Sequence, residues 1–217
     1  MNLKLPTIAL VALATGGALA YALLGGPGRT PPPGQSSQGV GPARSGELPA
    51  TGKPLIGGPF SLIDQTGKRV TDADFRGRYM LVFFGYTFCP DICPSGLQVI
   101  SAALDQLGPD AEKITPVFIT IDPARDTPEK MGAYVKSFHP RFVGLTGTPE
   151  EIAAAVKAYR VYAKKVAGET NPADDSMDHS SIVYLMGPGG GLVAFSPELT
   201  KPDALAAQIK KGLAYKG

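Results

Sequence analysis

Strand-like segments joined by tight turns occur at two separated places in the chain. Residues 59–71 alternate apolar and polar side chains around a Gln-Thr-Gly-Lys turn, which predicts a β-hairpin. Residues 180–187 and 191–196 are joined through a Gly-Pro-Gly-Gly turn and predict a second hairpin. We expect the first hairpin to open the folded part at a sheet edge and the second to close the sheet.

Two continuous apolar runs, at residues 79–86 and 113–122, have the length of strands. Such runs are typical of a sheet that is buried on both faces. Between them, residues 94–108 show apolar side chains at helical spacing. A strand, a helix and a second strand in this order form a crossover connection, so the two strands should be parallel.

Three further helices are predicted after this crossover. Residues 127–138 and 148–159 each begin with Thr-Pro-Glu, which supplies an N-cap, a proline at the first helical position and an acid in the first turn. Residues 201–215 predict a terminal helix. Strands alternating with helices, with a hairpin at each end, predict an α/β fold with a mixed sheet flanked by helices.

The N-terminal part of the chain has a different pattern. No charge lies between Lys4 and Arg29, and the apolar residues 7–24 reach the lower limit of ~17 residues for a membrane-spanning helix. We predict that residues 1–24 form a single-pass anchor in the cell inner membrane, with the folded domain on the outer, periplasmic side. A cleaved signal peptide, with small residues 18–20 before the cut, is the alternative, and either one exports the domain to where disulfides form.

Residues 25–54 are dense in glycine, proline and serine and have few large apolar side chains. A hydrophobic core cannot be built from this composition, so we predict a tether that is part flexible and part polyproline-like. The folded domain is then expected to span residues 55–217.

The composition sets limits on the kind of protein. The 217 residues are 43% apolar and 18% charged, as in ordinary globular domains. Lysine and arginine number 21 against 19 acidic residues, for a net charge of +2, and no long run of like charges occurs. We therefore expect no nucleic-acid partner.

Cys89 and Cys93 are the only cysteines, with three residues between them, and each is followed by proline. They fall where the predicted strand 79–86 gives way to a helix, and one helical turn would place their Cβ atoms ~5–6 Å apart on one face. This spacing suits a disulfide or a shared metal ion, and a helix N-terminus favours the thiolate that metal or redox chemistry needs. A purely structural disulfide would close too short a loop to constrain the unfolded chain strongly.

A redox pair and a soft-metal site therefore both remain open for these cysteines. The Cys-x-x-x-Cys spacing is one residue longer than the thioredoxin motif. His179, which follows a polar loop at residues 168–178, would reach the cysteines if its strand lay beside strand 79–86. Two thiolates and this imidazole suit copper(I), whereas His139 as a fourth donor would complete a zinc set. His139 at a helix end is otherwise interpreted as a surface histidine.

Two other groups of residues carry weaker indications. Asp122, Arg125 and Asp126 follow the strand at residues 113–122 and predict a helix-entry loop with an Asp–Arg pair, or alternatively the lining of a cleft. Met177 is a thioether near His179, and we interpret it as an ordinary loop methionine rather than an axial ligand.

Several separated stretches together resemble the Sco/SenC family of copper chaperones for cytochrome c oxidase. They are FSLIDQTGK, FFGYTFCPDICPSGL, TIDPARDTPEKM, FVGLTGTPEEI, YRVYAKK and DHSSIVYL. The resemblance implies a thioredoxin-like fold and copper, as Cu(I) or Cu(II), bound by Cys89, Cys93 and His179. His139 has no counterpart in that family, which argues against the zinc set.

The resemblance also implies a function and partners. The two sulfurs would bind copper when reduced and form a disulfide when oxidised, so that redox state gates metal loading. We expect a membrane-tethered metallochaperone that delivers copper to the dinuclear copper centre of cytochrome c oxidase. Its partners would be the copper-bearing oxidase subunit, an upstream copper donor and the membrane. The alternative is a thiol–disulfide reductase, with Cys89 and Cys93 as its redox pair, that keeps the copper-ligand cysteines of the oxidase reduced.

A third class, the peroxiredoxin-type peroxidase, shares the expected fold. Those enzymes carry threonine three residues before the reactive cysteine, and here that position is Tyr86. We therefore disfavour a peroxidase.

Overall fold

The computed structural model of the protein describes residues 55–168, 175–197 and 201–214. All of them belong to one compact unit of contacts. The predicted anchor and tether, residues 1–54, lie outside this range and stay predictions. Within the described ranges, no helix combines the length and the apolar character needed to cross a membrane.

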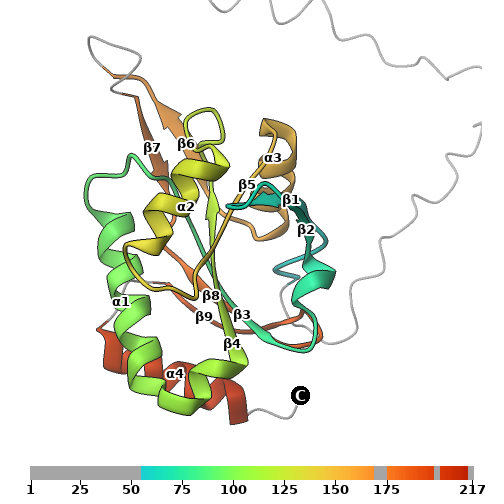
Figure 1. Ribbon diagram of the computed structural model, residues 1–217, viewed down its shortest axis with the longest axis vertical. Coiled ribbons are helices and arrows are strands. Elements are labelled where there is room, and N and C mark those ends of the chain that lie inside the picture. The colour runs from blue at the N-terminus through green and yellow to red at the C-terminus, as the bar shows by residue number, and fades with distance from the viewer. Residues whose placement is uncertain (1–54, 169–174, 198–200, 215–217) are drawn as a thin grey trace, which may run out of the picture. The chain divides into compact units, whose positions relative to one another are not determined.

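A seven-stranded mixed sheet forms the centre of the domain, in the order β2-β1-β5-β4-β3-β8-β9 (Figure 1). Strands β3, β4 and β5 are parallel, and the remaining pairs are antiparallel. The predicted parallel pair and the two edge hairpins are therefore confirmed. The strands are β1 Ser61–Asp64, β2 Arg69–Thr71, β3 Tyr79–Gly85, β4 Ile114–Thr120, β5 Val143–Thr146, β8 Val183–Met186 and β9 Leu192–Ser196.

Four α-helices flank this sheet, and all four were predicted. They are α1 Ile92–Leu107, α2 Pro128–Lys136, α3 Pro149–Ala158 and α4 Pro202–Ala214, with short 3-10 helices at Asp72–Phe75 and Gly108–Lys113. Helices α2 and α3 begin after Thr127 and Thr148, whose side chains accept hydrogen bonds from backbone N–H groups in the first turn. The Thr-Pro-Glu motif sets these starts because it caps the helix and fixes the first backbone angle.

Side chains of β3 alternate between the two faces of the sheet. Gly85 faces α1, and Leu185 on neighbouring β8 meets Gly212 of α4 on that same side. Phe84 points to the opposite face, where its ring lies 5.2 Å from that of Tyr159 just beyond α3. The β3–α1–β4 crossover followed by the β8–β9 hairpin and α4 makes the domain thioredoxin-like, as predicted (Figure 1).

Three short strands were not predicted. Strand β5 is four residues long and contains Gly144, which lets Met131 and Val135 of α2 approach to about 3.3 Å of where a Cβ would stand. Strands β6 Ala163–Val166 and β7 Ser176–His179 form a separate two-stranded antiparallel sheet. The predicted loop at residues 168–178 is therefore wrong in its last part, where β7 begins. The sequence did not indicate this strand because β7 is mostly polar and lacks a clear apolar alternation.

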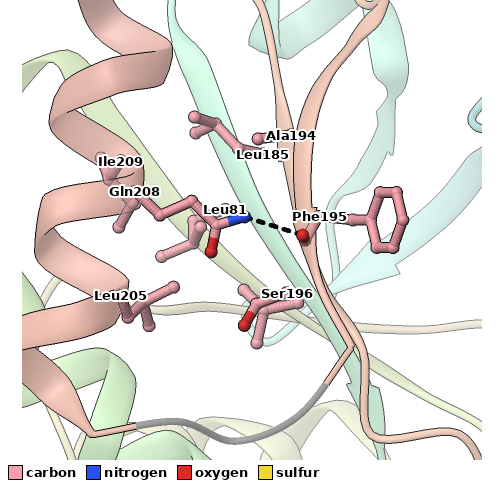
Figure 2. A pocket seen from close by; sticks show the side chains of 9 residues that line it. Leu81, Leu185, Ala194, Phe195, Ser196, Leu205, Gln208 and Ile209 are labelled. Carbon is pink, nitrogen blue, oxygen red and sulfur yellow. Dashed lines mark hydrogen bonds between the residues drawn. The ribbon is translucent and has the colours of Figure 1, made fainter.

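A cavity of about 10 Å³ lies between β8, β9 and α4 (Figure 2). Gln208 on α4 donates a hydrogen bond across it to the Phe195 carbonyl at 2.7 Å. Its walls are otherwise mostly apolar and include no cysteine or histidine. A space of this size holds at most one water molecule, so we assign it to the packing of α4 and not to ligand binding.

Candidate metal centre

The two cysteines lie on either side of the start of α1. After β3, the chain turns so that the Cys89 N–H donates to the Tyr86 carbonyl at 3.3 Å, and α1 then begins at Ile92. Cys89 thus precedes the helix and Cys93 lies in its first turn, which confirms the predicted strand-to-helix junction. The two cysteines do not share one helical turn, so the helical spacing considered for them does not apply. The Cys93 N–H instead donates to Cys89 Sγ at 3.3 Å. The N–H groups in the first turn of a helix have no acceptor within the helix, and Cys89 Sγ is the acceptor for the Cys93 N–H.

His179 is brought to the cysteines from the other end of the sequence. Its Nε2 lies 3.4 Å from Cys93 Sγ. The ligand atoms of Cys89, Cys93 and His179 all lie within 4.8 Å of one another. Both thiols are buried and free, and the imidazole is half-buried at the end of β7. The structure therefore gathers two sulfurs and one nitrogen around a common point.

The orientation of the His179 ring leaves one nitrogen available to that point. Its Nδ1 lies 3.1 Å from the Ser180 carbonyl oxygen. Because a carbonyl oxygen only accepts hydrogen bonds, this contact places the proton on Nδ1. Nε2 then presents its lone pair toward the thiols, which is the arrangement that a second hydrogen bond gives to metal-binding histidines.

The two thiols differ in acidity. A hydrogen bond from the Cys93 thiol is the main cause that lowers the pKa of Cys89 to about 4, and it outweighs the opposing effect of burial. Hydrogen bonds from the backbone N–H groups of Cys93 and Asp91 act in the same direction. The pKa of Cys93 is raised, mainly because its thiol donates to Cys89 and also because it is buried. Cys89 is therefore the thiolate of the pair, the form that binds metals and attacks disulfides.

Gly85 makes room for Cys93. A Cβ at position 85 would stand 2.7 Å from Cys93 Sγ and 2.8 Å from the Phe118 ring. Contacts that short do not occur without displacement, so the last residue of β3 has to lack a side chain. Our sequence analysis did not single out Gly85, although a glycine within a strand is a signal of close approach by another group.

Asp126 fixes the turn that carries Cys89. Its buried carboxylate accepts hydrogen bonds from the Thr87 N–H at 3.1 Å, from the Thr87 hydroxyl at 2.5 Å and from the Thr120 hydroxyl at 2.6 Å. The sequence predicted a helix-entry loop with an Asp–Arg pair, or alternatively the lining of a cleft, and the pair between Asp122 and Arg125 is present. Asp126 also lines a pocket together with Thr127 and Thr146. Nothing in the sequence distinguished the buried Asp126 from the partly buried Asp122 and Arg125, because its bonds to Thr87 and Thr120 form only when the ends of β3 and β4 come together.

His139 lies outside this group. Its Nδ1 accepts the Arg141 N–H at 3.2 Å and its Nε2 is 3.9 Å from Asp105. Its side chain is 16% exposed, so the predicted satisfied surface histidine has its hydrogen bond but is partly buried. Among the described residues, the candidate metal-binding group contains Cys89, Cys93 and His179 and no fourth histidine, cysteine or carboxylate.

Met177 lies two residues before His179 on β7, so the expected loop methionine belongs to a strand. Its backbone N–H donates to the Tyr86 hydroxyl at 3.3 Å. Its side chain packs against the hydrophobic core.

Comparison with known proteins places these features in a family. The pattern of the SCO1/SenC family matches residues 49–214. The chain is 44% identical to the mitochondrial SCO1 homolog 1 of Arabidopsis thaliana over 166 residues, 76% of this chain and 49% of that protein. It is 44% identical to the human mitochondrial SCO1 homolog, over 73% of this chain and 53% of that protein. The chain thus spans about half the length of these two relatives.

Solved structures give the same picture. Arabidopsis thaliana ScoI with copper bound has a TM-score of 0.69 and 43% identity, over 73% of this chain and 98% of that one. Bradyrhizobium japonicum ScoI with copper bound has a TM-score of 0.66 and 48% identity, over 72% and 98%. A third structure identifies a disulfide switch in BsSco, described as a member of the Sco family of cytochrome c oxidase assembly proteins. Its TM-score is 0.58 at 25% identity, over 76% of this chain and 98% of that one.

Proposed function

The chain belongs to the SCO1/SenC family, and on that premise we propose that it binds copper at Cys89, Cys93 and His179 for cytochrome c oxidase assembly. The observation that carries this proposal is the convergence of the three donor atoms within 4.8 Å of one another. Two similar structures, at 43% and 48% identity, were determined with copper bound. Copper in this account is the cargo that the protein carries.

The donor set fits copper better than zinc. Two thiolates and one imidazole are soft and borderline donors, and Cu(I) accepts low coordination numbers. Cu(II) prefers nitrogen donors more strongly, so His179 matters most for that oxidation state. Structural zinc sites almost always have four protein ligands, and the group found in the described part of the chain has three.

We further propose that redox state gates copper loading. When reduced, the thiolate of Cys89 and the thiol of Cys93, which loses its proton on binding, hold the metal. When a partner disulfide accepts two electrons and the Cys93 proton, its S–S bond breaks to a thiolate and a thiol, and Cys89 and Cys93 join in a disulfide that cannot hold copper. The disulfide switch identified in BsSco supports this part of the proposal.

The delivery step requires a protein partner, for which we propose the copper-bearing oxidase subunit with its dinuclear copper centre. Phe88 and Ile92 lie beside the two cysteines in sequence and are 54% and 41% exposed. The Arg125 guanidinium lies 4.8 Å from the centre of the Phe88 ring. Apolar side chains exposed next to the site suit a transient contact with another protein, and an upstream copper donor would use the same face.

A thiol–disulfide reductase is the second candidate, and one observation favours it. Cys89 Sγ accepts the Cys93 N–H at 3.3 Å at the start of α1, and this hydrogen bond helps to lower the pKa of Cys89. Such a sulfur favours the thiolate form, which can attack a disulfide without any metal. In this role the protein would reduce the copper-ligand cysteines of the oxidase. His179 would then be dispensable, because exchange between thiols and disulfides needs only the sulfurs.

The variant His179→Ala separates these two functions, with His139→Ala as its control. For the chaperone, cells carrying His179→Ala should lose oxidase assembly, while cells carrying His139→Ala should assemble the enzyme normally. The measurement is oxidase activity in membranes, beside the copper content of each purified variant. If His179→Ala loses copper and still supports full assembly, the chaperone proposal fails and the reductase takes its place.

We also propose that residues 1–24 anchor the protein in the cell inner membrane and that residues 25–54 tether the domain on the periplasmic side. The uncharged apolar stretch at residues 7–24 supports the anchor. N-terminal sequencing of the protein isolated from membranes tests it. The expected result is an intact N-terminus, and a mature protein that begins at Tyr21 would contradict the anchor.

A further inference from the structure

His179 is carried by a structural arm that does not belong to the main sheet. Strands β6 and β7 pair with each other, and in the described part of the chain neither pairs with a strand of the seven-stranded sheet. Even so, His179 at the end of β7 lies 3.4 Å from Cys93 Sγ. Some contact between this arm and the body of the domain therefore has to hold the imidazole in place.

Tyr86 makes that contact from the body. It directly follows β3 and its side chain is 3% exposed. The hydroxyl of Tyr86 accepts the backbone N–H of Met177 at 3.3 Å. Its ring meets the His179 ring edge-on, with centroids 6.1 Å apart and planes at 81°.

The two contacts act on one face of β7. Side chains of a strand alternate, so Met177 and His179 point to the same side, and both are less exposed than Ser176 and Asp178. The hydrogen bond from the Met177 N–H to the Tyr86 hydroxyl holds β7 at the residue that precedes His179 on the same face. The contact between the Tyr86 ring and the His179 ring holds the imidazole itself. Tyr86 is thus the residue that joins the end of β3 to the strand that bears the third donor.

We propose that Tyr86 is a positioning residue that latches β7 onto the body and so determines how well the site holds Cu(II). This inference rests on the proposed copper function. Cu(I) can be held by the two sulfurs alone, whereas Cu(II) depends on the imidazole nitrogen. A loosened arm should therefore weaken Cu(II) binding and leave Cu(I) binding nearly unchanged.

The test is Tyr86→Phe in the reduced full-length protein, which removes the hydroxyl and keeps the ring. In the copper-free protein, the Met177 amide should exchange its hydrogen faster than in wild type, because it has lost its acceptor. The affinity for Cu(II) should fall about fivefold, the equivalent of one hydrogen bond of ~1 kcal/mol, and the affinity for Cu(I) should not change.

Tyr134→Phe is the matched control. The Tyr134 hydroxyl is buried and has no hydrogen-bond partner within the described residues. The same chemical change there should alter neither the exchange of the Met177 amide nor the affinity for either copper ion.

Three outcomes of the Tyr86→Phe experiment would overturn the latch. In the first, the Met177 amide of the variant exchanges its hydrogen as slowly as in wild type. In the second, that amide exchanges faster but the variant keeps the wild-type affinity for Cu(II). In the third, the variant loses affinity for Cu(I) and Cu(II) equally. Failure of the wild-type protein to bind copper would instead overturn the proposed function. In that case faster exchange at Met177 would still support the latch, and unchanged exchange would reject it.

Discussion

At the scale of single residues, the two sulfurs of the site differ in acidity. Cys89 and Cys93 are chemically identical side chains, but one lies just before the helix and accepts N–H groups, and the other is enclosed within the first turn. The thiol of Cys93 donates to Cys89 and lowers the pKa of Cys89 to about 4. In the reduced protein, a Cys89 thiolate therefore lies beside a Cys93 thiol.

The lowered pKa of Cys89 predicts the pH dependence of its alkylation in the reduced, copper-free protein. Because the pKa of Cys89 is lowered to about 4, its thiolate is fully formed at neutral pH and is lost only as the pH falls toward that value. The rate of Cys89 alkylation by iodoacetamide should be nearly constant between about pH 6 and about pH 8, whereas that of an ordinary cysteine rises toward its pKa of ~8.5. Mass spectrometry of the modified peptide measures the rate.

Cys93→Ala provides the control for this profile. It removes the largest cause of the lowered pKa, so the alkylation profile of Cys89 should move to higher pH. A wild-type rate that rises about tenfold per pH unit through neutrality would show that Cys89 is an ordinary thiol.

Gly85→Ala tests the close approach of β3 and Cys93. The added methyl would stand 2.7 Å from Cys93 Sγ, so the thiol has to move. We expect the free energy of unfolding to fall by ~1–3 kcal/mol, as for other overpacked cores, and copper binding to weaken. Gly191→Ala is the matched control, because a Cβ there meets no atom within 4 Å. Equal stability and copper affinity of the two variants, measured by denaturant unfolding and metal titration, would count against this reading.

At the scale of elements, Asp126 connects the ends of three parallel strands. Its carboxylate accepts from Thr87 after β3 and from Thr120 at the end of β4, and its backbone carbonyl accepts the hydroxyl of Thr146 at the end of β5 at 2.7 Å. The turn that carries Cys89 is therefore tied to the sheet through a single buried side chain.

Asp126→Asn should loosen this connection, because an amide presents a donor where the carboxylate accepts. We expect the free energy of unfolding to fall by about 1–3 kcal/mol, with weaker copper binding as the turn shifts. Asp105→Asn is the control, since that side chain is 75% exposed and should change stability by no more than ~0.5 kcal/mol. Denaturant unfolding of both variants compares the two carboxylates, and matching midpoints would refute a structural role for Asp126.

How far each element could be predicted depends on how much of its pattern is local. The helices α2 and α3 were predictable because each begins with a Thr-Pro-Glu motif, in which the N-cap, the proline and the acid are adjacent in sequence. Strands β3 and β4 were predictable because burial on both faces requires a continuous apolar run. Strands β6 and β7 were missed because they are stabilised mainly by pairing with each other, which leaves little apolar signal in the sequence.

The same distinction applies to the site. Cys89 and Cys93 could be recognised from their spacing, and the conjunction with His179 came from a resemblance to a family. The supporting residues Tyr86 and Asp126 bond to Met177 and Thr87, which are distant from them in sequence. Their roles depend on distances in the folded chain, and a linear pattern does not contain them.

At the scale of the whole molecule, the described residues form one compact unit with its own hydrophobic core. We therefore predict that residues 55–217, produced without the N-terminal segments, fold as an independent domain. Chemical denaturation of that fragment should show a single cooperative transition. A gradual, non-cooperative transition would mean that the domain boundary is wrong.

The central claim about the whole molecule is that its copper site consists of Cys89, Cys93 and His179. The most direct test is the affinity of the reduced full-length protein for Cu(II), compared among wild type, His179→Ala and His139→Ala. We predict that wild type and His139→Ala bind copper equally and that His179→Ala loses most of its affinity, because Cu(II) requires the imidazole nitrogen. Wild-type affinity in His179→Ala, or loss of copper in His139→Ala, would contradict the account.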